Sequence, residues 1–271
     1  MRARRRPRLP LVGALALAAA TLLTACGAVA PAEPGPAATG DGGVGPSGEL
    51  TVHAAASLHE AFAELADEFM AAHPGTAITV STGGSSGLVA QLREGAPGDV
   101  LATADERTMA QAVEEGLIAG ETPVFATNTL AIVTEPGNPK GIAGLADLAA
   151  ADVRLVVCAE QVPCGAATAR LEAAAGVELR PVSEEHAVTD VLGKVVAGQA
   201  DAGLVYRTDA VGAGDAVAIV EMPEAAGIVN AYPIGVTANA ANPALARAWI
   251  EFVLAEPAQS RLQHDHGFGA P

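Results

Sequence analysis

A serine that follows a short apolar strand and opens a helix is the feature that most constrains this chain, because it occurs twice. Residues 50–56 suit an extended strand, and after Ser57 large apolar residues recur at helical spacing. A second predicted strand at 78–82 leads through a glycine-rich turn with Ser85 into another helix. The start of a helix presents unpaired backbone N–H groups and the positive end of the helix dipole, so the two junctions together predict an anion-binding site.

Ser57 also has a simpler structural interpretation. With Glu60, three residues later, it matches a capping box, in which the two side chains accept hydrogen bonds from the first backbone N–H groups of the helix. A capped helix without a ligand is therefore an alternative for this junction taken alone.

Strands and helices alternate through most of the remaining chain. The clearest predicted elements are strands at 99–102, 154–158 and 202–206 and helices at 105–115, 164–175 and 187–197. Such alternation favours parallel sheets with helices on both faces, and so an α/β fold. The region from about Glu49 to Pro271 is long enough for one large or two modest units of this kind.

Residues 1–25 have the pattern of an export signal. Five arginines in residues 1–8 precede an apolar stretch to about Leu23, and small residues precede Cys26. The ending Leu-Thr-Ala-Cys resembles a bacterial lipoprotein signal, which would make Cys26 the first mature residue, lipidated at its sulfur. An ordinary secretory peptide is the alternative.

Residues 26–48 read as a lipidated flexible tether, because alanine, glycine and proline dominate and large apolar side chains are almost absent. We therefore expect an exported protein that is lipid-anchored to the outer face of the cytoplasmic membrane.

The net charge of the chain limits the kinds of partner that it can bind. The net charge is −16, and removal of the signal with its five arginines brings the mature chain to about −21. Nucleic acids bind poorly to so acidic a chain, and we expect none as a partner.

The cysteines indicate a disulfide. With Cys26 assigned to a lipid, Cys158 and Cys164 remain, and a pair of cysteines in an exported protein is most simply a disulfide. The alternative is a metal site, but two cysteines without a nearby histidine make a weak zinc ligand set. We expect neither a metal held by protein side chains nor a cofactor.

Five short motifs occur in an order that resembles one known family. They are His53–Leu58, Gly84–Leu88, Gly95–Val100, Val162–Gly165 and Gly203–Ala210. Together they resemble the molybdate-binding proteins of ABC importers, and the resemblance covers nearly all of residues 49–271.

This resemblance implies a two-lobed periplasmic-binding-protein fold of type II, with a mostly parallel sheet flanked by helices in each lobe and the ligand in the cleft. It places residues 49–128 and 237–271 in lobe 1 and residues 129–236 in lobe 2. The chain is then expected to cross between the lobes near Thr127–Leu130 and near Val236–Ala238.

The resemblance also implies five ligand contacts. They are the hydroxyl and backbone N–H groups of Ser57 and Ser85, the backbone N–H groups of Cys164 and Val188, and the phenol of Tyr206. Departures from the family pattern leave two points open: Ser86 is an alternative to Ser85, and the contact at Val188 could fall one or two residues away. For Tyr206, ordinary packing at the end of a strand is the alternative.

These groups suit a tetrahedral dianion such as molybdate, whose oxygens only accept hydrogen bonds, because hydroxyl and N–H groups can all donate. A net charge near −21 argues against long-range attraction, so short charge-assisted hydrogen bonds, each worth about 1.5–3 kcal/mol, must supply the affinity. The predicted function is capture of molybdate, or of the similarly sized tungstate, by a monomer that delivers it to an ABC permease.

Two alternatives come from other chemistry. A sulfate- or phosphate-binding protein would use the same fold. A secreted serine hydrolase would use Ser57 or Ser85 as its nucleophile, but neither serine has the G-x-S-x-G surroundings of a nucleophile elbow, so we expect no enzyme.

Overall fold

A computed structural model describes residues 46–271. The predicted signal, the lipidated Cys26 and nearly all of the predicted tether lie outside these residues. Strand β1 begins at Gly48, so it includes the last residue that the sequence analysis assigned to the tether. Within residues 46–271, no helix combines the length and apolar character needed to cross a membrane.

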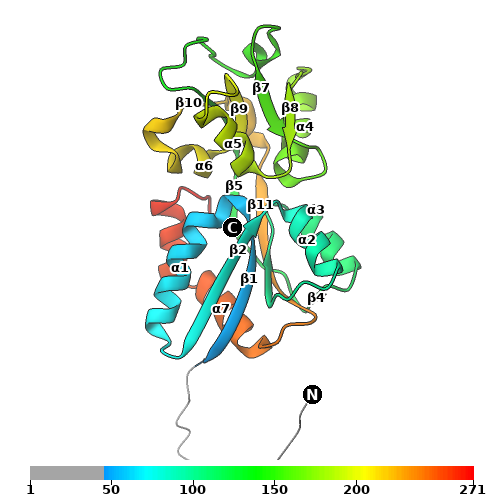
Figure 1. Cartoon of the computed structure of the whole chain (residues 1–271), viewed down its shortest axis with the longest axis vertical. Coiled ribbons are helices and arrows are strands. Elements are labelled where there is room, and N and C mark those ends of the chain that lie inside the picture. The colour runs from blue at the N-terminus through cyan, green and yellow to red at the C-terminus, as the bar shows by residue number, and fades with distance from the viewer. Residues whose placement is uncertain (1–45) are drawn as a thin grey trace, which may run out of the picture. The chain divides into compact units, whose positions relative to one another are not determined.

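The first lobe, as we name it here, is a six-stranded sheet with its helices (Figure 1). Its strands are β1 (Gly48–Ala55), β2 (Thr76–Gly83), β3 (Val100–Ala102), β4 (Ile118–Ala119), β5 (Val124–Asn128) and β11 (Asn230–Thr237). Its helices are α1 (His59–Ala72), α2 (Ser85–Arg93), α3 (Glu106–Glu114), α7 (Pro243–Leu254) and α8 (Glu256–Ser260), with a short 3-10 turn η1 (Ala56–Leu58) before α1 and a last turn η5 (Arg261–Asp265). Strand β1 runs parallel to β2 and β3, whereas β11 runs antiparallel to β3, β4 and β5.

The second lobe is a five-stranded sheet in the order β10-β6-β9-β7-β8 with its helices. Its strands are β6 (Leu130–Thr134), β7 (Leu155–Cys158), β8 (Ser183–Glu185), β9 (Ala202–Tyr206) and β10 (Ala218–Val220), and its helices are α4 (Pro163–Ala175), α5 (Val188–Val196) and α6 (Arg207–Gly212). Three 3-10 turns, η2 (Leu145–Ala149), η3 (Gly214–Ala216) and η4 (Pro223–Gly227), complete it.

Both sheets are mixed, which differs from the expectation of mostly parallel sheets. In the second lobe β7 is parallel to β8 and β9, but β6 is antiparallel to β9 and β10. Every antiparallel pair includes a strand that leads into or out of a connection between the lobes, namely β5, β6, β10 or β11. A strand that enters a sheet directly from the other lobe is not preceded by a helical crossover. Such a crossover is what makes a strand parallel to the previous strand of the same sheet.

Two segments connect the lobes. Strand β5 ends at Asn128 in the first sheet and β6 begins at Leu130 in the second, so the chain passes over at Thr129. It returns between β10, which ends at Val220, and β11, which begins at Asn230. The return expected at Val236–Ala238 is too late in the chain. Strand β11, which begins at Asn230, already belongs to the first sheet, where it pairs with three strands.

The cores of the lobes are built from strands covered on both faces. The central strands β6, β7 and β9 are buried along their whole length, as expected where helices flank a sheet. In the first lobe, α1 turns Phe62 and Phe69 toward Trp249 of α7, with ring centroids 5.7 and 5.6 Å away. This packing fixes α1, and with it the turn that carries Ser57, against the sheet.

Candidate functional site

A small cavity lies where the two lobes face each other. Residues from both lobes line it, including all five residues that the resemblance implied: Ser57, Ser85, Cys164, Val188 and Tyr206. Its volume is about 10 Å³, which is near the space of a single water. A tetrahedral oxyanion is larger than this space. We call this space the cleft cavity.

Helical segments begin around the cleft cavity on both sides. Helix α2 begins at Ser85, α4 at Pro163 and α5 at Val188, while η1 leads into α1. The residues before α2, α4 and α5 have extended backbones, and none of them caps its helix with a side chain. First-turn N–H groups have no acceptor within their own helix, so several converge on one small space. Their dipoles add positive potential there.

The predicted capping box at Ser57 is wrong. The turn η1 starts at Ala56, so Ser57 already lies inside the helical segment, and neither η1 nor α1 has a side-chain cap. The Ser57 hydroxyl instead lies 2.9 Å from the hydroxyl of Tyr232 on β11. This frees Ser57 from a helix-capping role and connects it to a tyrosine that the sequence analysis did not select.

The geometry separates Ser85 from its neighbour. The Ser85 side chain is buried, and its Oγ accepts a hydrogen bond from the backbone N–H of Ala104 at 3.1 Å. Ser86 is half-buried in a groove outside the cleft cavity and donates to the carbonyl of Gln161 in the second lobe at 2.8 Å. The arrangement therefore favours Ser85 for a ligand and gives Ser86 a contact between the lobes.

Cys164 is held in place by a covalent bond. Cys158 at the end of β7 and Cys164 in the first turn of α4 are joined through their sulfur atoms, with Cα atoms 5.6 Å apart. The side chain of Cys164 is thus occupied, and its backbone N–H, at the second position of α4, is the group that can face the cavity. The disulfide therefore fixes the start of α4 to the end of β7.

Three polar residues behind the cleft cavity were missed by the sequence analysis. Asn128, Asn230 and Tyr232 are buried on β5 and β11. Asn230 Nδ2 donates to the hydroxyl of Tyr206 at 2.8 Å, and Asn128 Nδ2 lies 3.4 Å from the hydroxyl of Tyr232. The only signal in the sequence was a polar residue beside each of two extended runs, and it did not reveal that the two runs pair.

The two tyrosines are kept protonated by their surroundings. Their rings meet edge to face with centroids 5.8 Å apart. Burial raises the pKa of Tyr206 and that of Tyr232 well above the ordinary value of 10.0. Both hydroxyls therefore keep their protons at any ordinary pH and can donate.

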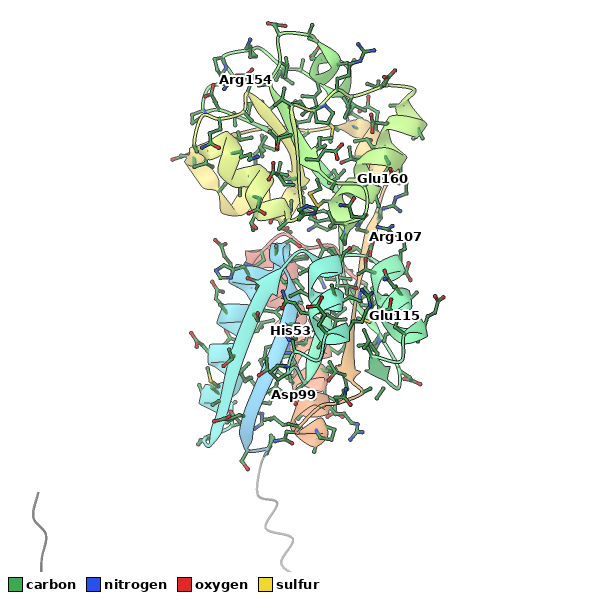
Figure 2. The ribbon with its side chains drawn as sticks, turned by 45° about the vertical axis from the view of Figure 1, so that its right-hand side comes forward. His53, Asp99, Arg107, Glu115, Arg154 and Glu160 are labelled. Carbon is green, nitrogen blue, oxygen red and sulfur yellow. A yellow bond between two sulfur atoms is a disulfide. The ribbon has the colours of Figure 1, made fainter. Side chains whose placement is uncertain are left out.

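The cleft cavity has no fixed charge. Among residues 46–271, those that line it include no lysine, arginine, aspartate or glutamate, and His186 is the one histidine. Arg107 lies at the boundary between the lobes, close to Glu160, and donates to the carbonyl of Gln161 at 3.1 Å (Figure 2). Arg154 lies far from this boundary and pairs with Asp201 of the second lobe. The polar groups that line this cavity are thus N–H, O–H and carbonyl dipoles and an imidazole, without a charged carboxylate, ammonium or guanidinium.

Asp209 is the perturbed carboxyl beside the site. Its carboxylate accepts a hydrogen bond from the backbone N–H of Tyr206 at 3.2 Å. Burial raises the pKa of Asp209 from 3.8 to about 7, and the carboxylate of Glu60 on the first lobe adds to the shift. Asp209 lines a second pocket, separate from the cleft cavity, together with His59 and His266.

Replacing Asp209 with asparagine is expected to stabilise the protein in a pH-dependent way. Because the folded-state pKa lies above the unfolded one, the folded state keeps a proton that the unfolded state has lost, and the wild-type free energy of unfolding falls between about pH 4 and pH 7. We expect a gain for Asp209→Asn that reaches about 1–2 kcal/mol at pH 8, since partial exposure weakens the effect. Urea unfolding at pH 4 and pH 8 measures it, with exposed Asp215→Asn as the control. A gain of the same size at both pH values would contradict it.

Comparison with known proteins places these features in context. A family model described as "Bacterial extracellular solute-binding protein" matches residues 50–269. The "Molybdate-binding protein ModA" of Mycobacterium tuberculosis is 46% identical over 249 residues, which cover 92% of this chain and 93% of that protein.

Solved structures share the fold at lower identity. The periplasmic molybdate-binding protein of Azotobacter vinelandii has a TM-score of 0.71 at 22% identity, over 82% of this chain and 99% of that one. The sulfate-binding protein SubI of M. tuberculosis H37Rv has a TM-score of 0.68 at 21% identity, over 81% of this chain and 86% of that one. The two-lobed fold is thus common to proteins named for two different oxyanions, and the choice between them must come from the site.

Proposed function

Because this chain belongs to the bacterial extracellular solute-binding protein family, we propose that it captures molybdate outside the cytoplasmic membrane and delivers it to an ABC permease. The M. tuberculosis relative named for molybdate matches 92% of the chain at 46% identity, which confirms the family resemblance of the sequence motifs. The fold expected from that resemblance is confirmed as well, apart from its mixed sheets.

One observation carries the proposal. Five groups from two lobes line one small cavity in which hydroxyl and backbone N–H groups are present and fixed charges are absent among the described residues. Ser57 and Ser85 come from the first lobe, and Cys164, Val188 and Tyr206 come from the second. We assign these five as the contacts to the oxyanion. Groups of this kind can all donate, which suits an ion whose oxygens only accept hydrogen bonds.

The spacing of such donors sets the choice of ion. Sulfate is smaller than molybdate, so some donors would be left unpaired, at about 1–3 kcal/mol each. Tungstate is nearly the size of molybdate and is expected to bind. A phosphate that keeps a proton at neutral pH must also donate a hydrogen bond, and the described residues that line the cavity include no carboxylate to accept it.

Capture requires closure of the lobes. Each lobe holds part of the contact set, so only the closed form can satisfy all four oxygens, and the ion favours that form. Hydrogen bonds from Ser86 and Arg107 of the first lobe to the carbonyl of Gln161 in the second also belong to the closed form. The closed form is the state that a permease would recognise.

We further propose that the protein works as a monomer, anchored through a lipid on Cys26 after removal of the signal and tethered by residues 26–48. A disulfide between Cys158 and Cys164 suits an oxidising location outside the cytoplasm. A hydrolase is disfavoured because the hydroxyls of Ser57 and Ser85 contact a tyrosine hydroxyl and a backbone N–H, and neither of these can act as a general base.

A thermal-shift series tests the proposal. The protein without its signal is heated alone and with molybdate, tungstate, sulfate or phosphate. An ion that binds the native state at a thousand times its dissociation constant adds about 4 kcal/mol to the free energy of unfolding, so molybdate and tungstate should raise Tm by several degrees. Stabilisation by sulfate alone would overturn the molybdate assignment, and no shift with any of the four would overturn oxyanion binding.

A further inference from the structure

A loop of the second lobe makes hydrogen bonds to the first lobe beside the cleft cavity. It is the segment of residues 158–164 between β7 and the first turn of α4, which the disulfide closes into a ring, and we call it the disulfide loop. A turn holds its middle, where the N–H of Val162 donates to the carbonyl of Ala159 at 3.0 Å. The loop is therefore a small closed unit, and we expect it to move as one piece with the start of α4.

Two carbonyls of the disulfide loop are not used by the backbone of their own lobe. The carbonyls of Ala159 and Val162 accept from the N–H groups of Val162 and Ala166. Within residues 46–271, no backbone N–H of the second lobe donates to the carbonyls of Glu160 and Gln161. A backbone carbonyl is a strong acceptor with two lone pairs, so both of these carbonyls are available to donors from outside the lobe.

Two side chains of the first lobe donate to these carbonyls. Ser86 Oγ of α2 donates to the Gln161 carbonyl at 2.8 Å, and Arg107 Nη2 of α3 donates to the same oxygen at 3.1 Å. The same Nη2 lies 3.5 Å from the carbonyl oxygen of Glu160. Figure 2 shows Arg107 and Glu160 on the two sides of the boundary between the lobes. Neither Ser86 nor Arg107 lines the cleft cavity, so these bonds join the lobes without touching the ligand.

The first turn of α3 orients the Arg107 side chain. Asp105 is buried and caps this helix, with its Oδ1 accepting from the N–H of Thr108 at 2.9 Å. The second oxygen of Asp105, Oδ2, lies 3.7 Å from Nε of Arg107. This ion pair engages one edge of the guanidinium and leaves Nη2 for the carbonyls of the disulfide loop.

The disulfide loop also carries a contact to the oxyanion. Cys164, whose backbone N–H we assign to the ion, ends the loop and lies three residues after Gln161. Holding the Gln161 carbonyl against the first lobe therefore also holds the Cys164 N–H at the cavity. When the lobes separate, the bonds to Gln161 break together with the ligand contacts of the second lobe.

We propose that Ser86 and Arg107 are positioning residues that hold the disulfide loop against the first lobe and thereby slow the release of the bound oxyanion. They act through the Gln161 carbonyl and not on the ion itself. This inference rests on the proposed oxyanion-binding function and adds the residues that set the residence time of the ion.

The proposal predicts which rate changes. Bonds that exist only in the closed form stabilise it and leave the open form, which the ion enters, unchanged. Their loss should therefore speed release and leave association as it was. A positive charge that attracted the anion would act differently, because its loss would slow association, most strongly at low salt. Ser86 separates the two explanations, since it donates to the same carbonyl and carries no charge.

The test compares Ser86→Ala and Arg107→Met with wild-type protein that lacks its signal. Release of radiolabelled molybdate is followed after addition of excess unlabelled molybdate, calorimetry gives the affinity, and the two together give the association rate. We expect each variant to release the ion about fivefold faster, with affinity lowered by the same factor and association unchanged. Ser86 is half-buried and Arg107 is exposed, so both variants should fold, which thermal melting checks.

Arg180→Met is the control for the change in net charge. Arg180 is an exposed arginine of the second lobe whose ion pair is with Glu178. Its replacement removes the same charge as Arg107→Met but no bond between the lobes, so release and association should both stay at the wild-type rates. Faster release from Arg180→Met, equal to that from Arg107→Met, would overturn the inference, because loss of charge alone would then explain the effect.

The remaining outcomes separate this inference from the proposed function. If the wild-type chain binds molybdate and both test variants release it within about twofold of the wild-type rate, the role of Ser86 and Arg107 is overturned and the proposed function stands. Slower association for Arg107→Met, with release unchanged in both variants, would assign the arginine to attraction of the anion and also overturn the inference. If the wild-type chain binds no oxyanion, both proposals fail.

Discussion

Replacing Gly84 with alanine is expected to lower molybdate affinity at least a hundredfold while the fold remains intact. A Cβ at Gly84, on the first lobe, would overlap the backbone carbonyl oxygen of His186 on the second and would lie 3.1 Å from its carbonyl carbon. The Gly84 backbone, with φ −60° and ψ 130°, suits any residue, so the first lobe itself accepts the methyl group. The obstacle arises only when the lobes come together.

The size of the effect follows from hydrogen-bond geometry. A backbone carbonyl cannot rotate away as a side chain can, so the lobes must stay apart by roughly the width that the methyl group needs. Hydrogen bonds weaken steeply beyond about 3.2 Å, and the contacts of the second lobe, from Cys164, Val188 and Tyr206, would all lengthen together. Losing several charge-assisted bonds of about 1.5–3 kcal/mol each is more than a hundredfold in affinity.

Gly87 provides the matched control. It lies three residues further along, inside α2, and a Cβ there meets no atom within 4 Å. Gly87→Ala should therefore keep the wild-type affinity and raise stability by about 0.5–1 kcal/mol. Calorimetric titration gives the affinities and thermal melting reports the fold. Binding by Gly84→Ala within threefold of wild type would show that the ligand does not require the closed arrangement.

The secondary-structure elements that were predicted correctly depend on residues that lie close together in the chain. Strands at 50–56 and 202–206 and helices at 164–175 and 187–197 follow from apolar periodicity, and the structure has elements at each of these places. Such predictions succeed because the spacing of side chains along one element does not depend on the rest of the fold. The five expected contact residues came instead from the resemblance of short motifs to one family.

The features that could not be predicted depend on residues far apart in the chain. The register that sets Asn128 opposite Asn230 joins two strands separated by the whole second lobe, and no local pattern encodes it. The same distance hid Tyr232 as the partner of Ser57. The local match of Ser57 and Glu60 to a capping box was an alternative for this junction taken alone, and in the folded protein the Ser57 hydroxyl contacts Tyr232 instead.

The antiparallel strands have the same origin. Alternation of strands and helices predicts parallel pairing because a helix returns the chain to the same end of the sheet. The connections at Thr129 and before Asn230 carry no such helix, so β6 and β11 enter their sheets in the opposite direction. The direction of a strand is set by its connection, which sequence periodicity does not describe.

A second large effect is expected within the second lobe, where Gly165→Ala should reduce the free energy of unfolding by about 3 kcal/mol or more. A Cβ at Gly165, in the first turn of α4, would overlap the backbone carbonyl of Ala159 and lie 2.7 Å from the carbonyl oxygen of Cys158. Urea unfolding measures the loss. Gly193→Ala in α5, where a Cβ meets no atom within 4 Å, is the control and should stabilise by about 0.5–1 kcal/mol.

The disulfide makes this position harder to accommodate. Cys158 and Cys164 tie the end of β7 to the first turn of α4, so the helix cannot simply move away from the segment that Gly165 contacts. The methyl group would instead shift the start of α4, together with the Cys164 N–H that we assign to the ligand. Affinity should therefore fall along with stability in Gly165→Ala, whereas Gly84→Ala should lose affinity alone. Wild-type stability in Gly165→Ala would mean that α4 can move despite the bond, and that the disulfide does not set the position of the Cys164 N–H.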